Sequence, residues 1–135
     1  PSFVTGFLIK KFGAPTIIYL GLLLLAIAAV IAASGIALEN FYLALVVLGV
    51  GWNFGFIGST SLLTDALAPE ERASVQGIND TAIALASALA AFASGAVVAG
   101  FGWTTLVLAS LPIIGVAALV LFWNRRGNSL AREFR

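Results

Sequence analysis

Long apolar runs that are nearly free of charge are the feature that most constrains the fold of this chain. Asp, Glu, Lys and Arg make up only 10% of its 135 residues, whereas soluble domains carry about 25%. A bilayer core is roughly 30 Å thick, and about 20 helical residues are needed to cross it. The runs have this length and lack the alternation of barrel strands. The sequence therefore predicts an all-α integral membrane protein.

Four of the runs are long enough to be complete transmembrane helices. We expect them at approximately residues 14–37, 41–67, 75–100 and 103–123. Residues 1–9 are apolar but too short to cross, so we expect them to be the tail of a fifth transmembrane helix. The chain has no methionine and opens with Pro1, which indicates a piece of a longer protein.

Positive charge is confined to one side of this arrangement, in loops expected at 10–13 and 68–74 and in a tail at 124–135. The opposite loops, around Glu39 and Gly102, contain no lysine or arginine. An excess of lysine and arginine marks the cytoplasmic side. We therefore expect a multi-pass protein in the lipid of the cell (plasma or inner) membrane, with a cytoplasmic C-terminus. The seven positive residues are Lys10, Lys11, Arg72, Arg125, Arg126, Arg132 and Arg135.

Several classes of chemistry are excluded by what this sequence lacks. It contains no cysteine and no histidine, which rules out disulfides, ordinary zinc sites and histidine-based catalysis within it. The glycines at 49 and 51 lie inside a span and not at a strand-to-helix turn, so they are not a nucleotide fingerprint. We expect neither an enzyme nor a cofactor nor a metal, and the basic tail is explained by orientation without nucleic acid.

Small residues recur every fourth position on the second and third spans. Such faces let helix backbones approach closely, which is how membrane helices associate. Close helix packing is therefore the favoured interpretation. The residues are Gly51, Gly55 and Ser59 on the second span, and Ser87, Ala91 and Gly95 on the third.

One face of the third span is also polar, since Asp80, Ser87 and Ser94 share it by helical spacing. An acid facing lipid would be costly, so this face is expected to look into the protein or into a wet cavity. Ser87 is accordingly a candidate for a substrate path. Asp80 lies only about a turn and a half inside the span, so an interfacial acid hydrated by headgroups is an equal alternative.

Asn53 lies near the middle of the second span, where an amide must find a polar partner. Two roles are compatible with this position: Asn53 binds a substrate, or it joins two helices. Trp52 and Phe56 lie beside it and offer aromatic surface suited to a ligand. We favour a substrate path lined by Asn53, Trp52 and Phe56.

Two segments resemble the major facilitator superfamily of membrane transporters. Residues 6–13, GFLIKKFG, are similar to the signature loop G-x-L-x-D-R-x-G that joins the second and third helices of each half. Lys10 stands where that loop usually has its acid. Leu62–Asp65, followed by Pro69–Arg72 and Gln76-Gly77, resembles the cytoplasmic turn between the fourth and fifth helices of a half.

The resemblance implies a twelve-helix bundle, of which this chain covers the end of helix eight through helix twelve. Its partners would be the missing N-terminal helices, a small-molecule substrate and a coupling ion such as H⁺. The implied activity is secondary active transport by alternating access, with a cytoplasmic gate. The candidate gate residues are Lys10, Lys11, Asp65, Arg72 and Asp80, with the two lysines facing Asp65.

Two other functions are compatible with four spans. A four-helix membrane scaffold, or assembly subunit, would use the small-residue faces to bind partner helices. A small multidrug exporter working as a dimer would need an acid in its first span, and residues 14–37 contain none. Transport therefore leads, and the scaffold is the alternative.

Overall fold

The computed structural model of the chain describes residues 2–133, together with the side chains of residues 3–124. This part of the chain forms helices and no strand: α1 (Ser2–Phe12), α2 (Ala14–Ala33), α3 (Leu38–Asp65), α4 (Pro69–Phe101) and α5 (Trp103–Glu133). Four helices, α2 to α5, are long and apolar enough to cross a membrane. The predicted all-α membrane class, with four complete spans and a shorter helix, is confirmed.

Single glycines separate two pairs of consecutive helices. Gly13 lies between α1 and α2 with φ 83°, and Gly102 lies between α4 and α5 with φ 84°. Only glycine adopts such angles readily, because it has no Cβ. Pro15 and Pro69 lie in the first turns of α2 and α4, where a missing N–H costs no helical hydrogen bond.

The charged segments are more helical than the sequence suggested. The expected loop at 68–74 is helical from Pro69 onward, and residues of the expected loop at 10–13 complete α1 up to Phe12. Charge does not break a helix, and Glu70 and Glu71 in the first turn of α4 favour it by opposing the helix dipole. The expected tail is helical up to Glu133. The positions at which the membrane surfaces cross these helices stay predictions.

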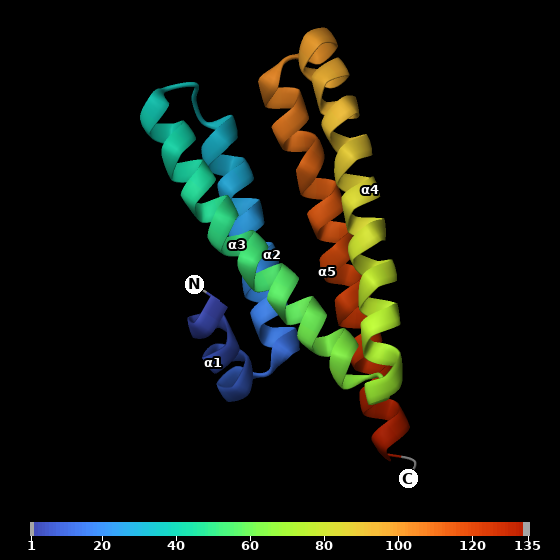
Figure 1. Ribbon diagram of the computed structural model, residues 1–135. Coiled ribbons are helices and arrows are strands. Elements are labelled where there is room, and N and C mark those ends of the chain that lie inside the picture. The colour runs from blue at the N-terminus through green and yellow to red at the C-terminus, as the bar shows by residue number, and fades with distance from the viewer. Residues whose placement is uncertain (1, 134–135) are drawn as a thin grey trace.

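The helices form two hairpins, α2–α3 and α4–α5, whose turns lie at the same end of the molecule (Figure 1). Helix α2 packs against α3 and α5, and α1 packs against both α2 and α3. The buried apolar residues belong mainly to α2: Ala14, Ile17, Ile18, Ala28 and Ala29, joined by Ala44 of α3. Helix α2 is therefore the centre of the fold. Helix α4, in contrast, buries no residue in the described part of the chain.

The tightest contact in the bundle is the crossing of α2 and α3 at Gly21. A Cβ at Gly21 would lie 2.7 Å from the amide nitrogen of Gly55 and 2.8 Å from the carbonyl oxygen of Gly51. A Cβ at Gly51 would lie 3.0 Å from the carbonyl oxygen of Gly21. These neighbours are backbone atoms, which cannot rotate away. Glycine at both sites is what lets the two backbones touch.

The two hairpins contact each other at the end of the bundle where their turns lie. The indole nitrogen of Trp103, the first residue of α5, donates a hydrogen bond of 3.0 Å to the carbonyl oxygen of Ala32. This carbonyl belongs to the last turn of α2, whose carbonyls have no partner within the helix. The ring of Trp103 also packs on Phe41 of α3, with the ring centroids 5.4 Å apart. Trp103 thus connects α5 to both helices of the other hairpin.

We predict that Gly21→Ala lowers the free energy of unfolding by roughly 1–3 kcal/mol, because the added methyl overpacks a backbone contact. Denaturant unfolding of the purified protein in detergent measures the change. The matched control is Gly49→Ala on α3, whose Cβ would meet nothing within 4 Å. That variant gains the helix propensity of alanine without a clash, so it should be neutral or slightly stabilising. Equal effects of the two substitutions would contradict the close crossing.

Trp103→Phe removes the indole N–H and keeps an aromatic ring beside Phe41. We expect a loss of about 0.5–1.5 kcal/mol in the free energy of unfolding, the usual net contribution of one hydrogen bond. Trp123→Phe serves as the control, because Trp123 is 81% exposed. If both variants unfold alike, the bond to Ala32 does not connect the hairpins.

Candidate functional site

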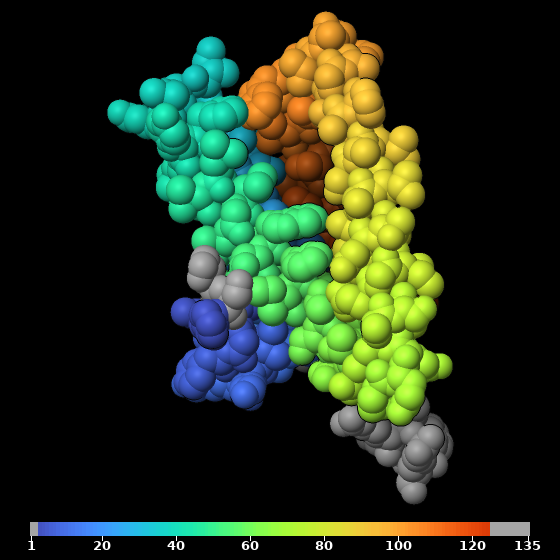
Figure 2. Space-filling view, viewed as in Figure 1, coloured from blue at the N-terminus to red at the C-terminus, as the bar shows by residue number. Residues whose placement is uncertain are grey.

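An open groove of about 720 Å³ lies between the two hairpins. Figure 2 shows the space between α3, in teal to green, and α4, in yellow, with α5 visible behind. Helices α3 and α4 form its walls, while α2 and α5 form its floor. The floor is apolar and consists of Ile18, Leu22, Leu25, Ala117, Val120 and Leu121.

Aromatic side chains line one stretch of the α3 wall. Trp52 and Phe56 lie one helical turn apart, which brings them to the same face, and both line the groove. Their ring centroids are 6.2 Å apart and their planes differ by 18°, so the rings are stacked. Both rings stay accessible, with Trp52 53% and Phe56 38% exposed. These two candidates for the substrate path therefore face the same cavity.

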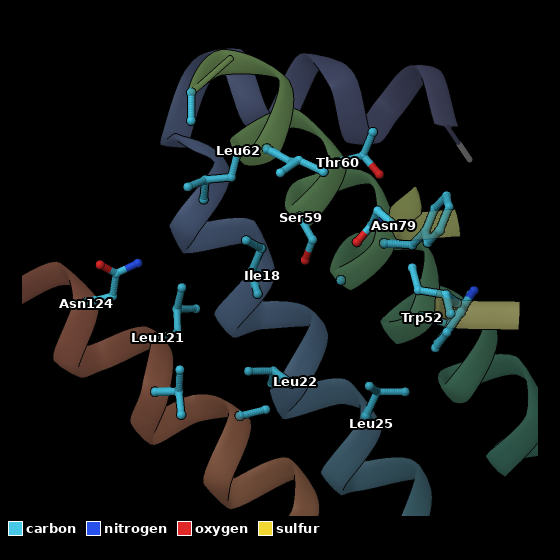
Figure 3. Close-up of a pocket in the computed structure, with 17 residues that line it drawn as sticks. Ile18, Leu22, Leu25, Trp52, Ser59, Thr60, Leu62, Asn79, Leu121 and Asn124 are labelled. Carbon is cyan, nitrogen blue, oxygen red and sulfur yellow. The ribbon is translucent and has the colours of Figure 1, made fainter. Parts of the chain in front are cut away.

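Polar side chains line the part of the groove nearer the end of α3, which we call its polar end; in Figure 3, Asn124 lies across the cavity from Ser59, Thr60 and Asn79. They are Ser59 and Thr60 of α3, Asn79 of α4 and Asn124 of α5. The end of α3, the beginning of α4 and the C-terminal part of α5 lie at the same end of the bundle (Figure 1). No Asp, Glu, Lys or Arg is found among the lining residues that the structure describes. The groove thus combines an aromatic wall, an apolar floor and an uncharged polar end.

Two of these polar residues, Thr60 and Asn124, were not singled out from the sequence. They and Asn79 lie far apart along the chain, and only the folding of the hairpins brings them to the same groove. Asn79 lies beside Asp80 in the opening turns of the third span, and a polar group there needs a partner.

Asn53 has a partner within the protein. Its side-chain oxygen accepts a hydrogen bond of 2.7 Å from the hydroxyl of Thr5, a residue with no exposed surface. The bond joins α1 to α3, which is how an amide connects two membrane helices. Asn53 does not line the groove. Its place on the substrate path stays a prediction, as does that of Ser87, which is exposed on α4.

Four of the candidate gate residues lie at helix ends: Lys10 and Lys11 in α1, Asp65 in α3 and Arg72 in α4. Asp80 lies about three turns into α4. Arg72 donates from Nε to the carbonyl oxygen of Leu67 at 3.3 Å, and Asp80 accepts from the amide of Gln76 at 3.2 Å. The ammonium of Lys11 lies 5.3 Å from the centroid of its neighbour, Phe12. Lys10 and Asp65 are exposed. The latch between the lysines and Asp65 stays a prediction.

The small-residue faces occupy different surroundings. Gly51 and Gly55 lie at the crossing with α2, and both Gly55 and Ser59 line the groove. Ala91 and Gly95 are exposed on α4, and their role in helix packing stays a prediction. Gly21, the glycine of α2 that meets this face, was not predicted from the sequence. A glycine within the apolar run of residues 14–33 was the only sign of this contact.

The described side chains contain no cluster of three or more acidic residues that could hold a metal. The chemistry that the groove offers is instead non-covalent: stacking on aromatic rings, apolar contact and hydrogen bonding to hydroxyl and amide groups.

Comparison with known proteins extends over nearly the whole chain. The chain is 41% identical over 133 residues to the riboflavin transporter RfnT of Brucella anthropi, covering 98% of this chain and 33% of that protein. It is 41% identical over 128 residues to an uncharacterised MFS-type transporter, YddS, of Bacillus subtilis, covering 93% and 29%. It is 33% identical over 116 residues to the methylenomycin A resistance protein of Bacillus subtilis, covering 85% and 25%. No solved structure gives a significant match.

The chain thus spans between a quarter and a third of the length of these relatives. The first two names describe transporters, and none describes an enzyme. The model of the Major Facilitator Superfamily matches residues 2–134. This match covers both the signature-like loop and all four complete spans, so the chain belongs to the major facilitator superfamily.

Proposed function

We propose that this chain forms part of a secondary transporter that moves a small solute across a membrane by alternating access. The observation that carries the proposal is the family match over residues 2–134, supported by four helices of membrane-spanning length. The further helices of the intact transporter are its expected partners. In such transporters the substrate site lies near the middle of the membrane, and two helical units rock around it.

The distribution of positive charge supports an orientation for this transporter. Lys10, Lys11 and Arg72 lie at the end of the bundle where α3 meets α4 (Figure 1). By the positive-inside rule this end faces the cytoplasm, and the C-terminus with it. The polar end of the groove would then lie towards the cytoplasm. We assign the protein to the cell membrane on the same argument.

Riboflavin is the first solute to test, because it is named for a relative that is 41% identical over 98% of this chain. The groove supports a place for a solute, since typical small-molecule pockets measure about 300–1,000 Å³. Trp52 and Phe56 would meet the solute directly. Asn53 would affect the substrate path indirectly, through its hydrogen bond to Thr5, or would contact the solute in another state of the transporter.

The cytoplasmic gate is proposed to involve Lys10, Lys11, Asp65, Arg72 and Asp80. Opposite charges at one membrane surface attract, and a contact between Asp65 and the lysines could break and re-form as the transporter changes state. H⁺ is the proposed coupling ion. Its binding acid would belong to the helices outside this sequence, because coupling sites lie near the midplane, whereas Asp65 is the last residue of α3 and Asp80 lies in the first half of α4.

Uptake of riboflavin by cells that produce the intact transporter tests the proposed function. We expect saturable uptake above that of cells with an empty vector, and we expect a protonophore to abolish accumulation if H⁺ is coupled. A panel of other solutes, including methylenomycin A, is measured in parallel. Transport of no solute by a correctly inserted protein would reject the function and favour the membrane scaffold.

Asp65→Asn tests the gate. An exposed ion pair contributes about 1 kcal/mol or less, so we expect the transport rate to fall by up to about fivefold, with the amount of protein in the membrane unchanged. The matched control is Glu39→Gln, an acid in the first turn of α3, at the opposite end of the same helix. Unchanged transport by the Asp65 variant would remove this residue from the gate.

A further inference from the structure

We infer that the groove binds an uncharged, flat aromatic solute that carries a hydroxyl-rich or amide-rich end. Its ring would lie against Trp52 and Phe56, and its polar end would reach Ser59 and Asn79. The inference rests on the proposed function, because it names the class of solute that the transporter would carry.

The aromatic wall determines the first property of the solute. Trp52 and Phe56 present two nearly parallel rings, with 18° between their planes, and both are accessible from the groove. Aromatic rings associate face to face with an offset, and a pair contributes beyond the area that it buries. A flat ring system that enters the groove can extend this stack. A branched aliphatic solute of equal volume would lose that contribution.

The absence of charge determines the second property. The described lining holds no ionisable side chain, and its floor consists of aliphatic residues of α2 and α5. An ion without a partner in such surroundings is strongly disfavoured. Asp80 follows Asn79 in sequence but does not line the groove, and its carboxylate accepts a hydrogen bond from Gln76. The groove therefore favours a neutral solute over its phosphorylated or carboxylated derivatives.

The polar end determines the third property. Ser59 lies seven residues after Trp52 on the same helix, which is about 10 Å along the axis. An asparagine amide offers two donors and an acceptor, and a serine hydroxyl offers one donor and an acceptor. No hydrogen bond to another described residue occupies the side chain of Ser59 or Asn79. Both remain available to hydroxyl or amide groups at the end of a solute whose ring reaches Trp52.

Binding of riboflavin, its 5′-phosphate and ribitol to the intact transporter in detergent tests the three properties separately. Riboflavin has an uncharged flat ring system and a polyol chain, its phosphate adds negative charge, and ribitol lacks the ring. We expect saturable riboflavin binding with quenched flavin fluorescence, at least tenfold weaker binding of the phosphate, and no competition by ribitol at equal concentration.

Variants assign these effects to the groove. Trp52→Ala should weaken riboflavin binding by about tenfold, whereas Phe92→Ala, at an aromatic residue of α4 that is 84% exposed and does not line the groove, should leave it unchanged. Asn79→Lys supplies a cation at the polar end. We expect it to lower the ratio of the dissociation constants of the phosphate and riboflavin by at least about tenfold. An unchanged ratio, or equal effects of Trp52→Ala and Phe92→Ala, would overturn the inference.

Thiol labelling shows whether the groove is open to solutes in the intact protein. Ser59→Cys, in a variant without other cysteines, should react with a water-soluble maleimide, and riboflavin should protect it. A cysteine that stays unlabelled in the folded transporter would mean that another helix or lipid fills the groove, and the inference would fail. Binding as described but without uptake would retain the inference and reject the proposed function. Uptake only of charged or non-aromatic solutes would retain the proposed function and reject the inference.

Discussion

The crossing of α2 and α3 is the contact on which the rest of the arrangement depends. In lipid there is little hydrophobic drive between helices, so association relies on close packing and on polar contacts. Gly21 and Gly51 bring the two backbones together, with a Cβ at either site within 3.0 Å of a backbone atom of the other helix. Because α2 also packs on α1 and α5, this crossing fixes the position of α3 relative to the other elements.

The groove is a consequence of that geometry. With α3 held against α2, and α5 joined to the far end of α2 through Trp103, helices α3 and α4 remain as separate walls. The wall of α3 then directs Trp52, Phe56 and Ser59 into the space between them. Two adjacent faces of α3 therefore have different roles. The face with the glycines packs against α2, and the face with the aromatic and hydroxyl side chains lines the candidate site.

Much of the fold could be predicted from the sequence, because the length of the apolar runs, the positions of the prolines and the glycines between helices determine local structure. The helices at 14–33 and 103–124, and the breaks at Gly13 and Gly102, follow from such signals. The partner of Asn53 could not be predicted, since Thr5 lies 48 residues away and belongs to a short helix. Gly21 was missed for the same reason. Its role depends on which helices meet, and no local pattern encodes that.

A structure of the intact transporter with riboflavin bound, determined by electron cryo-microscopy, would show whether the space between α3 and α4 is part of a solute pathway. We expect density for the flavin ring against Trp52 and Phe56, with the polyol chain directed towards Ser59 and Asn79. Density for another helix of the same protein in this space, with the flavin bound elsewhere or absent, would contradict this expectation.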